Sequence, residues 1–436
     1  MIWIINILII SLFILSLKNF RAGYVGCLLF RILFPWYVVF KIDSFQVGSS
    51  YLLVLFLIVA WFVQKDRNVF PKYLFHLFLF YVGYTLVLIF FSSAVIPYGM
   101  QFRGVVARIF LGDVGWFVLG VYAFKNGDFF CRKLVAGLLF VIGVYGIVAY
   151  ILNVNIWTNY LSLLYDNDDR FAFFLNEVRG NLIGRTSGTF EHPLAWGQFW
   201  NIILCALVVR KNEVSLKVFA LLVVVSLLNI YFSGSRAALL TALLTMGVLF
   251  FSYKMKKIAK IAAFAVAAAF FVVPNMSSKM VDYLETSIFF WQKASQKTYI
   301  VGSSTDMRYD QYNAAVEIVM NNPIGGMGFD LQNYHEFLPG IYHRLMGYES
   351  VVIKLMVEQG LVGLVCFFVF FYYLCMYYIK RCPKEKRLLM VGFCCCYLFS
   401  ALFTGVQGFS FLIFMLCLWI EQRNEWMGKN ENTLAL

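Results

Sequence analysis

Long uninterrupted apolar runs dominate the chain, and their lengths predict membrane-spanning helices. A helix needs about 20 apolar residues to cross the hydrocarbon core, and continuous runs of this kind exclude the alternating pattern of a transmembrane barrel. Some runs are shorter, so one or two predicted spans would be re-entrant or merged. The thirteen predicted spans cover residues 2–17, 23–41, 49–63, 74–95, 105–124, 134–152, 193–209, 218–233, 236–252, 259–275, 350–379, 388–404 and 408–421.

Composition supports the same class. Of the 436 residues 61% are hydrophobic and only 14% are charged, whereas soluble domains carry roughly a quarter charged residues. A soluble enzyme would leave much of this apolar surface in contact with water. We therefore expect an all-α polytopic integral membrane protein with about 11–14 transmembrane helices.

The basic residues predict an orientation. The net charge is +13, and 22 of the 36 lysines and arginines fall in alternate connections and in the tail. Because basic residues concentrate on the cytoplasmic side, this pattern places the carboxyl terminus in the cytoplasm and, with thirteen spans, the amino terminus outside. A nucleic-acid-binding function is not expected, since no polar domain gathers the basic residues on one surface.

Two long connections lie on the opposite, outer side of this topology, at residues 153–192 and 276–349. Both are too long for simple turns, and long connections often carry function. The sequence predicts one membrane domain over residues 1–436, with the second connection forming a small helical cap. Within that cap, residues 308–320 show the apolar spacing of an amphipathic helix.

Arginines gather in these outer connections, where basic residues are usually scarce. A guanidinium group is planar, permanently charged and able to bind two phosphate oxygens at once. The cluster therefore suits an anionic ligand whose tail lies in lipid, such as a diphosphate-linked lipid. The alternative is pairing with acids such as Asp168, Asp169, Glu177 or Asp310. The arginines are Arg103, Arg170, Arg179, Arg185, Arg236, Arg308 and Arg344.

Arg236 and Arg185 are the sharpest candidates in this set. Arg236 closes a turn, Ser-Gly-Ser-Arg, between two apolar spans and has no acid close in sequence. Desolvating an arginine there costs several kcal/mol unless it is paired, which predicts a partner from another element or from a ligand. Arg185 precedes a segment with hydroxyls, Glu191 and His192. His192 is either a base for catalysis or a surface group before Pro193.

Two further candidates lie in the second connection. Arg308 and Asp310 open the predicted amphipathic helix, and a glycine-rich turn follows at residues 325–328. Such a turn is a weak phosphate-binding signal, and the alternative is a tight turn that folds the loop back on the membrane.

Tyr348 and Glu349 precede the next apolar run. Glu349 suits a general base for a sugar hydroxyl, near Lys354, or an acid that stabilises a helix start. Arg31, Arg108 and Asp113 lie inside predicted spans, and a simple interpretation pairs Arg108 with Asp113.

Metal chemistry is not expected. The sequence has no carboxylate cluster of the kind that binds divalent cations. Eight of the ten cysteines lie in apolar runs, which is typical of small buried side chains rather than disulfides or zinc ligands.

Three segments in order resemble the O-antigen polymerase and ligase superfamily over roughly residues 180–380. They are the turn 233–236 (SGSR), the loop from Arg308 to 322–328 (NPIGGMG), and 358–364 (EQGLVGL). The resemblance implies a membrane glycosyltransferase of GT-C-like architecture, working without cofactor or metal at the outer, periplasmic face of the bacterial cytoplasmic membrane. Its donor and acceptor would be undecaprenyl-diphosphate-linked oligosaccharides, and a chain-length regulator protein is a further expected partner.

One difference from the ligase sequence pattern favours the polymerase branch. Ligases of this family typically carry a histidine followed by asparagine about eleven residues before the glycine that matches Gly360, whereas this chain has Glu349 and Ser350 there. The expected roles are diphosphate binding by Arg236, Arg308 and Arg185, and proton removal by Glu349 or, in another register, His343. Weaker expected glycan contacts are His192, Glu191, Asp310 and Tyr348. The alternatives are an O-antigen ligase and a flippase for the same lipid-linked sugars.

Overall fold

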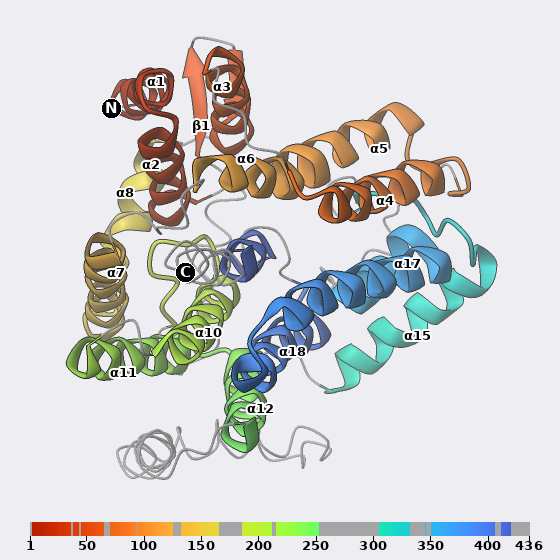
Figure 1. Ribbon diagram of the computed structural model, residues 1–436. Coiled ribbons are helices and arrows are strands. Elements are labelled where there is room, and N and C mark those ends of the chain that lie inside the picture. The colour runs from red at the N-terminus through yellow and green to blue at the C-terminus, as the bar shows by residue number, and fades with distance from the viewer. Residues whose placement is uncertain are drawn as a thin grey trace, which may run out of the picture.

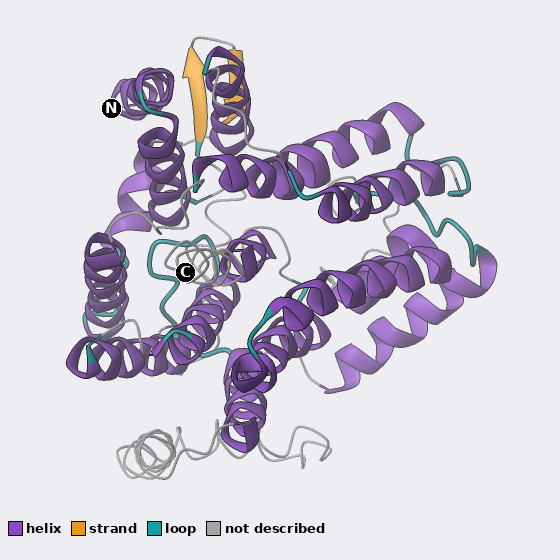
Figure 2. Cartoon of the chain, viewed as in Figure 1, coloured by secondary structure: helices purple, strands orange, loops and turns teal. Residues whose placement is uncertain are grey.

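The computed structural model describes residues 2–35, 38–42, 45–64, 70–93, 95–124, 132–164, 185–211, 215–252, 305–331, 345, 350–405 and 411–419. These residues are mostly helical (Figures 1 and 2). The helices are α1 Ile2–Lys18, α2 Phe20–Leu33, α3 Ser49–Val63, α4 Lys72–Ile89, α5 Tyr98–Gly104, η1 Val105–Gly115, α6 Trp116–Ala123, α7 Arg132–Ile151, α8 Ile156–Leu164, α10 Pro193–Val209, α11 Leu216–Phe232, α12 Arg236–Ser252, α15 Thr305–Asn321, α17 Val351–Arg381, η6 Lys384–Lys386 and α18 Arg387–Phe403; the strands are β1 Val39–Ile42 and β2 Phe45–Gly48.

The predicted class, an all-α polytopic membrane protein, is confirmed. Twelve of the thirteen predicted spans overlap helices of the structure, and the remaining one, 259–275, lies outside the described residues. Within the described ranges, four helical segments are long and apolar enough to cross a membrane, namely Lys72–Ile89, Tyr98–Ala123, Val351–Arg381 and Lys384–Phe403. Six shorter apolar helices accompany them.

The predicted span 23–41 is wrong at its carboxyl-terminal end. Helix α2 ends at Leu33, and Phe34 is already extended. Proline at position 35 explains this end, since proline disfavours helical backbone in the residue before it and has no N–H to continue the ladder. The chain then forms an antiparallel hairpin in which Val39 pairs with Gly48 and Ile42 with Phe45.

The segment predicted as a plain span at 105–124 contains a π-helix. Residues Val105–Gly115 form η1, which continues α5 into α6. A π-helix bonds each residue to the one five positions away, whereas an α-helix bonds residues four apart. Residues five apart, such as Arg108 and Asp113, are therefore brought towards the same side of this helix.

Helix α17 is broken in its amino-terminal third. Gly360 has a non-helical backbone with φ 67° and ψ −169°. The break interrupts the helical ladder, and the loop at residues 323–328 supplies new partners. Met327 N–H donates to Val357 C=O (2.8 Å), Gly328 N–H donates to Glu358 C=O (3.2 Å), and Leu361 N–H donates to Pro323 C=O (2.8 Å). Residues 361–381 alone extend about 30 Å, enough to cross a bilayer.

The amino-terminal half of α17 packs against α15, which confirms the predicted amphipathic helix (Figure 1). The buried stripe of α15 follows the helical spacing of three and four residues. A second small core forms there, separate from the main one, from Ile96, Ala314, Ala315, Ile318, Leu331, Leu345, Ile353 and Val357. The main core runs through the rest of the bundle, with stacked rings such as Phe371, Tyr397 and Phe414 between α17, α18 and the helical residues 411–419.

Substitution at the break should destabilise the fold. A Cβ on Gly360 would lie 2.5 Å from the Pro323 carbonyl oxygen, and one on Gly326 would lie 2.5 Å from that of Val357. Both glycines have positive φ, so Gly360→Ala or Gly326→Ala adds about 1–3 kcal/mol of backbone strain to the clash. We expect each variant to lower the thermal midpoint of the purified protein in detergent by several degrees. Gly83→Ala is the matched control, because nothing lies within 4 Å of its Cβ and alanine favours helix. Equal midpoints for the three variants would contradict the role given to the break.

Candidate functional site

The turn before Arg236 is shaped by its two serines. Ser233 Oγ donates to the Ile230 carbonyl (2.6 Å) and accepts from Ser235 N–H (3.3 Å). Ser235 Oγ accepts from Ala238 N–H (3.1 Å), as the N-cap of a helix does. Helix α12 therefore starts at Arg236, as the predicted span 236–252 implied.

Arg185 lies far from this turn in the sequence but contacts it in the structure. Its Nε donates to the Ser233 carbonyl (3.0 Å), and the neighbouring Thr186 N–H donates to the Phe232 carbonyl (3.0 Å). A Cβ on Gly234 would lie 2.8 Å from Arg185 Cγ, so the arginine packs closely where only glycine leaves room. The structure thus brings two of the three predicted diphosphate-binding positions, 185 and 236, together.

The position of Arg236 is electrostatically unfavourable for a cation. It is the first residue of α12, where the helix dipole is positive and where anions are stabilised. An arginine at this end adds to the positive potential instead of neutralising it. The N-terminus of α12 and Arg185 together therefore suit an anion.

Hydrogen bonds anchor the segment 185–192 to neighbouring elements. Thr189 Oγ1 donates to the Ile32 carbonyl at the end of α2 (2.7 Å), and Asn155 Nδ2 donates to the Gly188 carbonyl (2.8 Å). His192 caps α10, because its Nδ1 accepts from Leu194 N–H (3.1 Å). The Nδ1 lone pair of His192 is therefore engaged by the helix cap. The capping role thus competes with the predicted role as a base.

Glu191 lies next to this cap, half-buried and close to Arg31 of α2. Burial raises the pKa of the Glu191 carboxyl above its ordinary value. A hydrogen bond with its own backbone and the charges of Arg31 and His192 oppose this rise. Glu191 therefore links the 185–192 segment electrostatically to the end of α2.

The glycine-rich turn is a structural turn rather than a phosphate cradle. The N–H groups of Met327 and Gly328 are occupied by carbonyls of α17. Asn322 closes the turn, with its Nδ2 donating to the Gly326 carbonyl (2.9 Å). The weak phosphate-binding interpretation of this motif is not supported for these two donors.

Asp330, which follows this turn, forms an ion pair with Arg108 inside the bundle. Arg108 Nη2 lies 2.7 Å from Asp330 Oδ1, and the Asp330 side chain is only 5% exposed. Asp330 has a positive φ of 74°, a conformation that is uncommon outside glycine but that aspartate adopts more readily than most residues. Gln101 Oε1 holds the preceding residue by accepting from Phe329 N–H (3.0 Å). The simple pairing of Arg108 with Asp113 is thus wrong as a direct ion pair, although Asp113 stays within electrostatic range of Arg108.

Further polar and charged side chains lie within electrostatic range of the Arg108–Asp330 pair. Lys354, on the amino-terminal half of α17, interacts most strongly with Glu358 one turn on, and also with Arg108, Asp330 and Asp113. On the other side, Tyr51 at the start of α3 interacts with Arg108 and with Arg31. We call Glu191, Arg31, Tyr51, Arg108, Asp330 and Lys354 the polar strip. All of its members except Asp330 keep part of their side-chain surface accessible.

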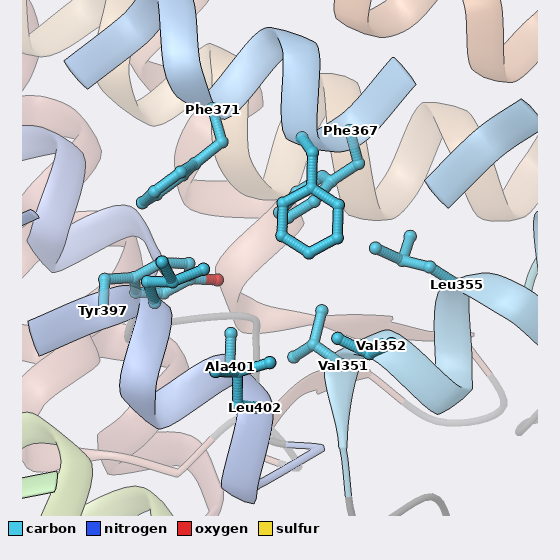
Figure 3. A pocket seen from close by; sticks show the side chains of 10 residues that line it. Val351, Val352, Leu355, Phe367, Phe371, Tyr397, Ala401 and Leu402 are labelled. Atoms are coloured by element: carbon cyan, nitrogen blue, oxygen red, sulfur yellow. The ribbon is translucent and has the colours of Figure 1, made fainter. Parts of the chain in front are cut away.

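An apolar pocket lies beside the strip, between the two halves of α17 and α18 (Figure 3). Phe367, Phe371 and Tyr397 converge on one side of it and Val351, Val352 and Leu355 on the other. The only polar side chain in its lining is Tyr397. No charged side chain lines this pocket.

The other predicted site residues are placed only in part. Asp310 is exposed on α15, and Arg308 lies in the same helix, its side chain outside the described part. Glu349, His343 and Tyr348 lie outside the described residues, as does the side chain of Arg236. Among the residues that the structure describes, no three His, Cys, Asp or Glu side chains gather as a metal site. Arg31, Arg108 and Lys354 are charged residues within apolar runs of the sequence. That unusual charge is the sequence signal of the strip, although the sequence does not show that these residues lie together.

Residues 221–368 match the protein family described as O-Antigen ligase. The matched region contains the turn before Arg236, α15, the glycine-rich turn and the break in α17. No curated protein matches the chain. The family match supports the O-antigen polymerase and ligase superfamily, whose members are glycosyltransferase-like membrane enzymes, in agreement with the resemblance of the motifs.

Loss of the cap at Ser235 should loosen the start of α12. Ser235 is 1% exposed, and Ser235→Ala removes a buried helix cap, which costs about 1–2 kcal/mol. The thermal midpoint of the purified protein measures this loss. Ser215→Ala is the matched control, since Ser215 is an exposed N-cap with a long 3.5 Å bond to Val218 N–H. Equal decreases of the thermal midpoint in both variants would show that the cap at Ser235 stabilises the protein no more than an exposed cap does.

Proposed function

We propose that this protein is a polysaccharide polymerase that joins undecaprenyl-diphosphate-linked oligosaccharide units at the outer face of the bacterial cytoplasmic membrane. The class, a membrane protein of the O-antigen polymerase and ligase type, rests on the helices and the family match. The observation that supports the donor site is the meeting of Arg185 with the turn that starts α12 at Arg236.

A lipid diphosphate fits this place for three reasons. Its negative charge is favoured by the positive end of α12 and by two arginines, with Arg308 as the proposed third. Its tail can remain in lipid, because the turn joins two apolar helices. Its departure during glycosyl transfer develops further negative charge, which preorganised cations stabilise.

The proposed reaction inverts the donor sugar. A hydroxyl at the non-reducing end of the acceptor attacks the anomeric carbon of the donor in line. The new carbon–oxygen bond forms as the bond from that carbon to the diphosphate oxygen breaks, and the lipid diphosphate leaves with the bonding electrons. Glu349, or His343 in its place, takes the hydroxyl proton. No metal is required in this scheme, because the arginines balance the charge of the leaving group.

The alternative function, an O-antigen ligase, differs in its acceptor, which is lipid A core rather than another repeat unit. We favour the polymerase because position 349 holds glutamate where the ligase pattern has histidine. A flippase would bind the same lipid. The break in α17 is a feature that transporters also use, but the family match supports glycosyl transfer.

Removing the cation at the start of α12 should slow chain extension strongly. We expect Arg236→Ala to lower the turnover rate of the purified full-length protein in proteoliposomes by about 10²–10³, as for other preorganised charge stabilisers. Arg236→Lys keeps the charge but loses the two-pronged geometry, so its loss should be intermediate.

Arg103→Ala is the matched control for this experiment. Arg103 is an exposed arginine on α5 and takes no part in the proposed donor site, so its rate should stay within about threefold of wild type. Wild-type extension by Arg236→Ala would overturn the donor-site assignment.

Surface glycan from cells with and without the protein distinguishes the two branches. Cells that lack a polymerase should carry single repeat units on their surface acceptor, because transfer continues without chain growth. Cells that lack a ligase should instead accumulate long polymer on the carrier lipid. Gel electrophoresis of both glycan fractions reads the outcome, and stranded polymer would assign the protein to the ligase branch.

A further inference from the structure

The polar strip has no role in the proposed reaction, yet it joins segments that are far apart in the sequence. We propose that this strip, from Glu191 through Arg31 and Tyr51 to Arg108, Asp330 and Lys354, is the subsite that binds the acceptor glycan. The inference rests on the proposed function, since it names the second substrate site of the same enzyme.

The charges of the strip lie where charge is costly. Arg108, Asp113 and Lys354 lie in helical segments that are apolar enough to cross a membrane. Ionisable groups at such places are costly and mark substrate paths more often than structural contacts. Asp113 is 7% exposed, and the electrostatic partners of its carboxylate include Lys354 and Arg108.

The backbone around Asp330 is closely constrained. Asp330 has a positive φ, and Gln101 accepts a hydrogen bond from the N–H of the preceding Phe329. Helix α5 also approaches closely, since a Cβ on Gly104 would lie 2.8 Å from Asp330 Cβ. The π-helix brings Arg108 and Asp113 to one side. Strain and π-helical turns concentrate at functional sites.

The strip is linked to the proposed donor site through one segment. Glu191 and Arg185 belong to the same hydrogen-bonded segment, 185–192, and Arg185 donates to the turn that starts α12. The charge of Glu191 acts on Arg31, and the charges of Arg31 and Arg108 act on Tyr51. An acceptor bound along this strip would approach the segment that carries Arg185.

The charges of the strip nearly balance. The donor site gathers arginines at a positive helix end, which suits an anion. The strip instead combines three cations with two carboxylates and a phenol, and the neighbouring Asp113 and Glu358 add two further carboxylates. A near-neutral set of donors and acceptors suits a polyhydroxylated glycan, whose hydroxyl groups both donate and accept hydrogen bonds.

Tyr51→Phe is the mildest test, because Tyr51 is partly accessible and only its hydroxyl is removed. The probe is the repeat-unit oligosaccharide released by mild acid from the carrier lipid of the producing cells. We expect Tyr51→Phe to raise the dissociation constant of this probe, and the KM for the lipid-linked acceptor, by about two- to tenfold, the effect of one hydrogen bond. The KM for the donor should not change. Tyr372→Phe, an exposed residue of α17, is the matched control and should behave as wild type.

A charge exchange separates binding from a purely structural ion pair. Arg108→Gln should weaken probe binding by tenfold or more. The double variant Arg108→Asp with Asp330→Arg restores the attraction between the two positions but reverses what each offers to a ligand. If the pair is only structural, the double variant recovers wild-type probe binding and the proposal fails. Wild-type binding by Tyr51→Phe and Arg108→Gln also overturns it, and Tyr51→Phe decides the matter if the charge variants do not fold.

The same binding assay distinguishes this inference from the proposed function. Wild-type protein that does not bind the oligosaccharide at all contradicts the proposed substrate class. Binding by the wild-type protein that is insensitive to every strip variant contradicts only the location of the acceptor.

Discussion

The break of α17 at Gly360 is the constraint on which much of the described structure depends. Backbone N–H and C=O groups without partners cost several kcal/mol each at membrane depth, so a broken helix needs partners from another segment. The loop at 323–328 supplies them, through the carbonyls of Val357 and Glu358 and the N–H of Leu361. The two glycine-containing motifs therefore act as one unit, and α15 is fixed against the bundle as a consequence.

The unit formed by the loop 323–328 and the break of α17 also positions charged side chains. The loop continues directly into Asp330, which meets Arg108, and the amino-terminal half of α17 carries Lys354 to the same place. A straight α17 would not need the loop, and Asp330 would lose its position. The serines of the turn before α12 and the hydrogen-bonded segment 185–192 hold a second, more positive group. The two groups differ in charge balance, which is the physical basis for assigning them to a diphosphate and to a glycan.

The same features bear on the alternatives. A broken helix is shared with transporters, so it does not by itself separate a flippase from a glycosyltransferase. The family match over residues 221–368 covers the turn, the loop and the break together, and it supports the polymerase and ligase superfamily. The apolar pocket between α17 and α18 carries no charged group, so neither proposed substrate site is placed there.

The sequence alone determined the membrane class, most helix positions and the turn before Arg236, because these follow from local hydropathy and short-range hydrogen bonds. Span 193–209 matches α10 at both ends, and span 236–252 matches α12. Hydropathy could not find the end of α2 before Pro35, since residues 34–40 continue the apolar run. It also could not find the π-helix or the true partner of Arg108. Ion pairs between residues far apart in the chain, and the partners of a broken helix, depend on how segments pack in space. Only the tertiary structure decided them.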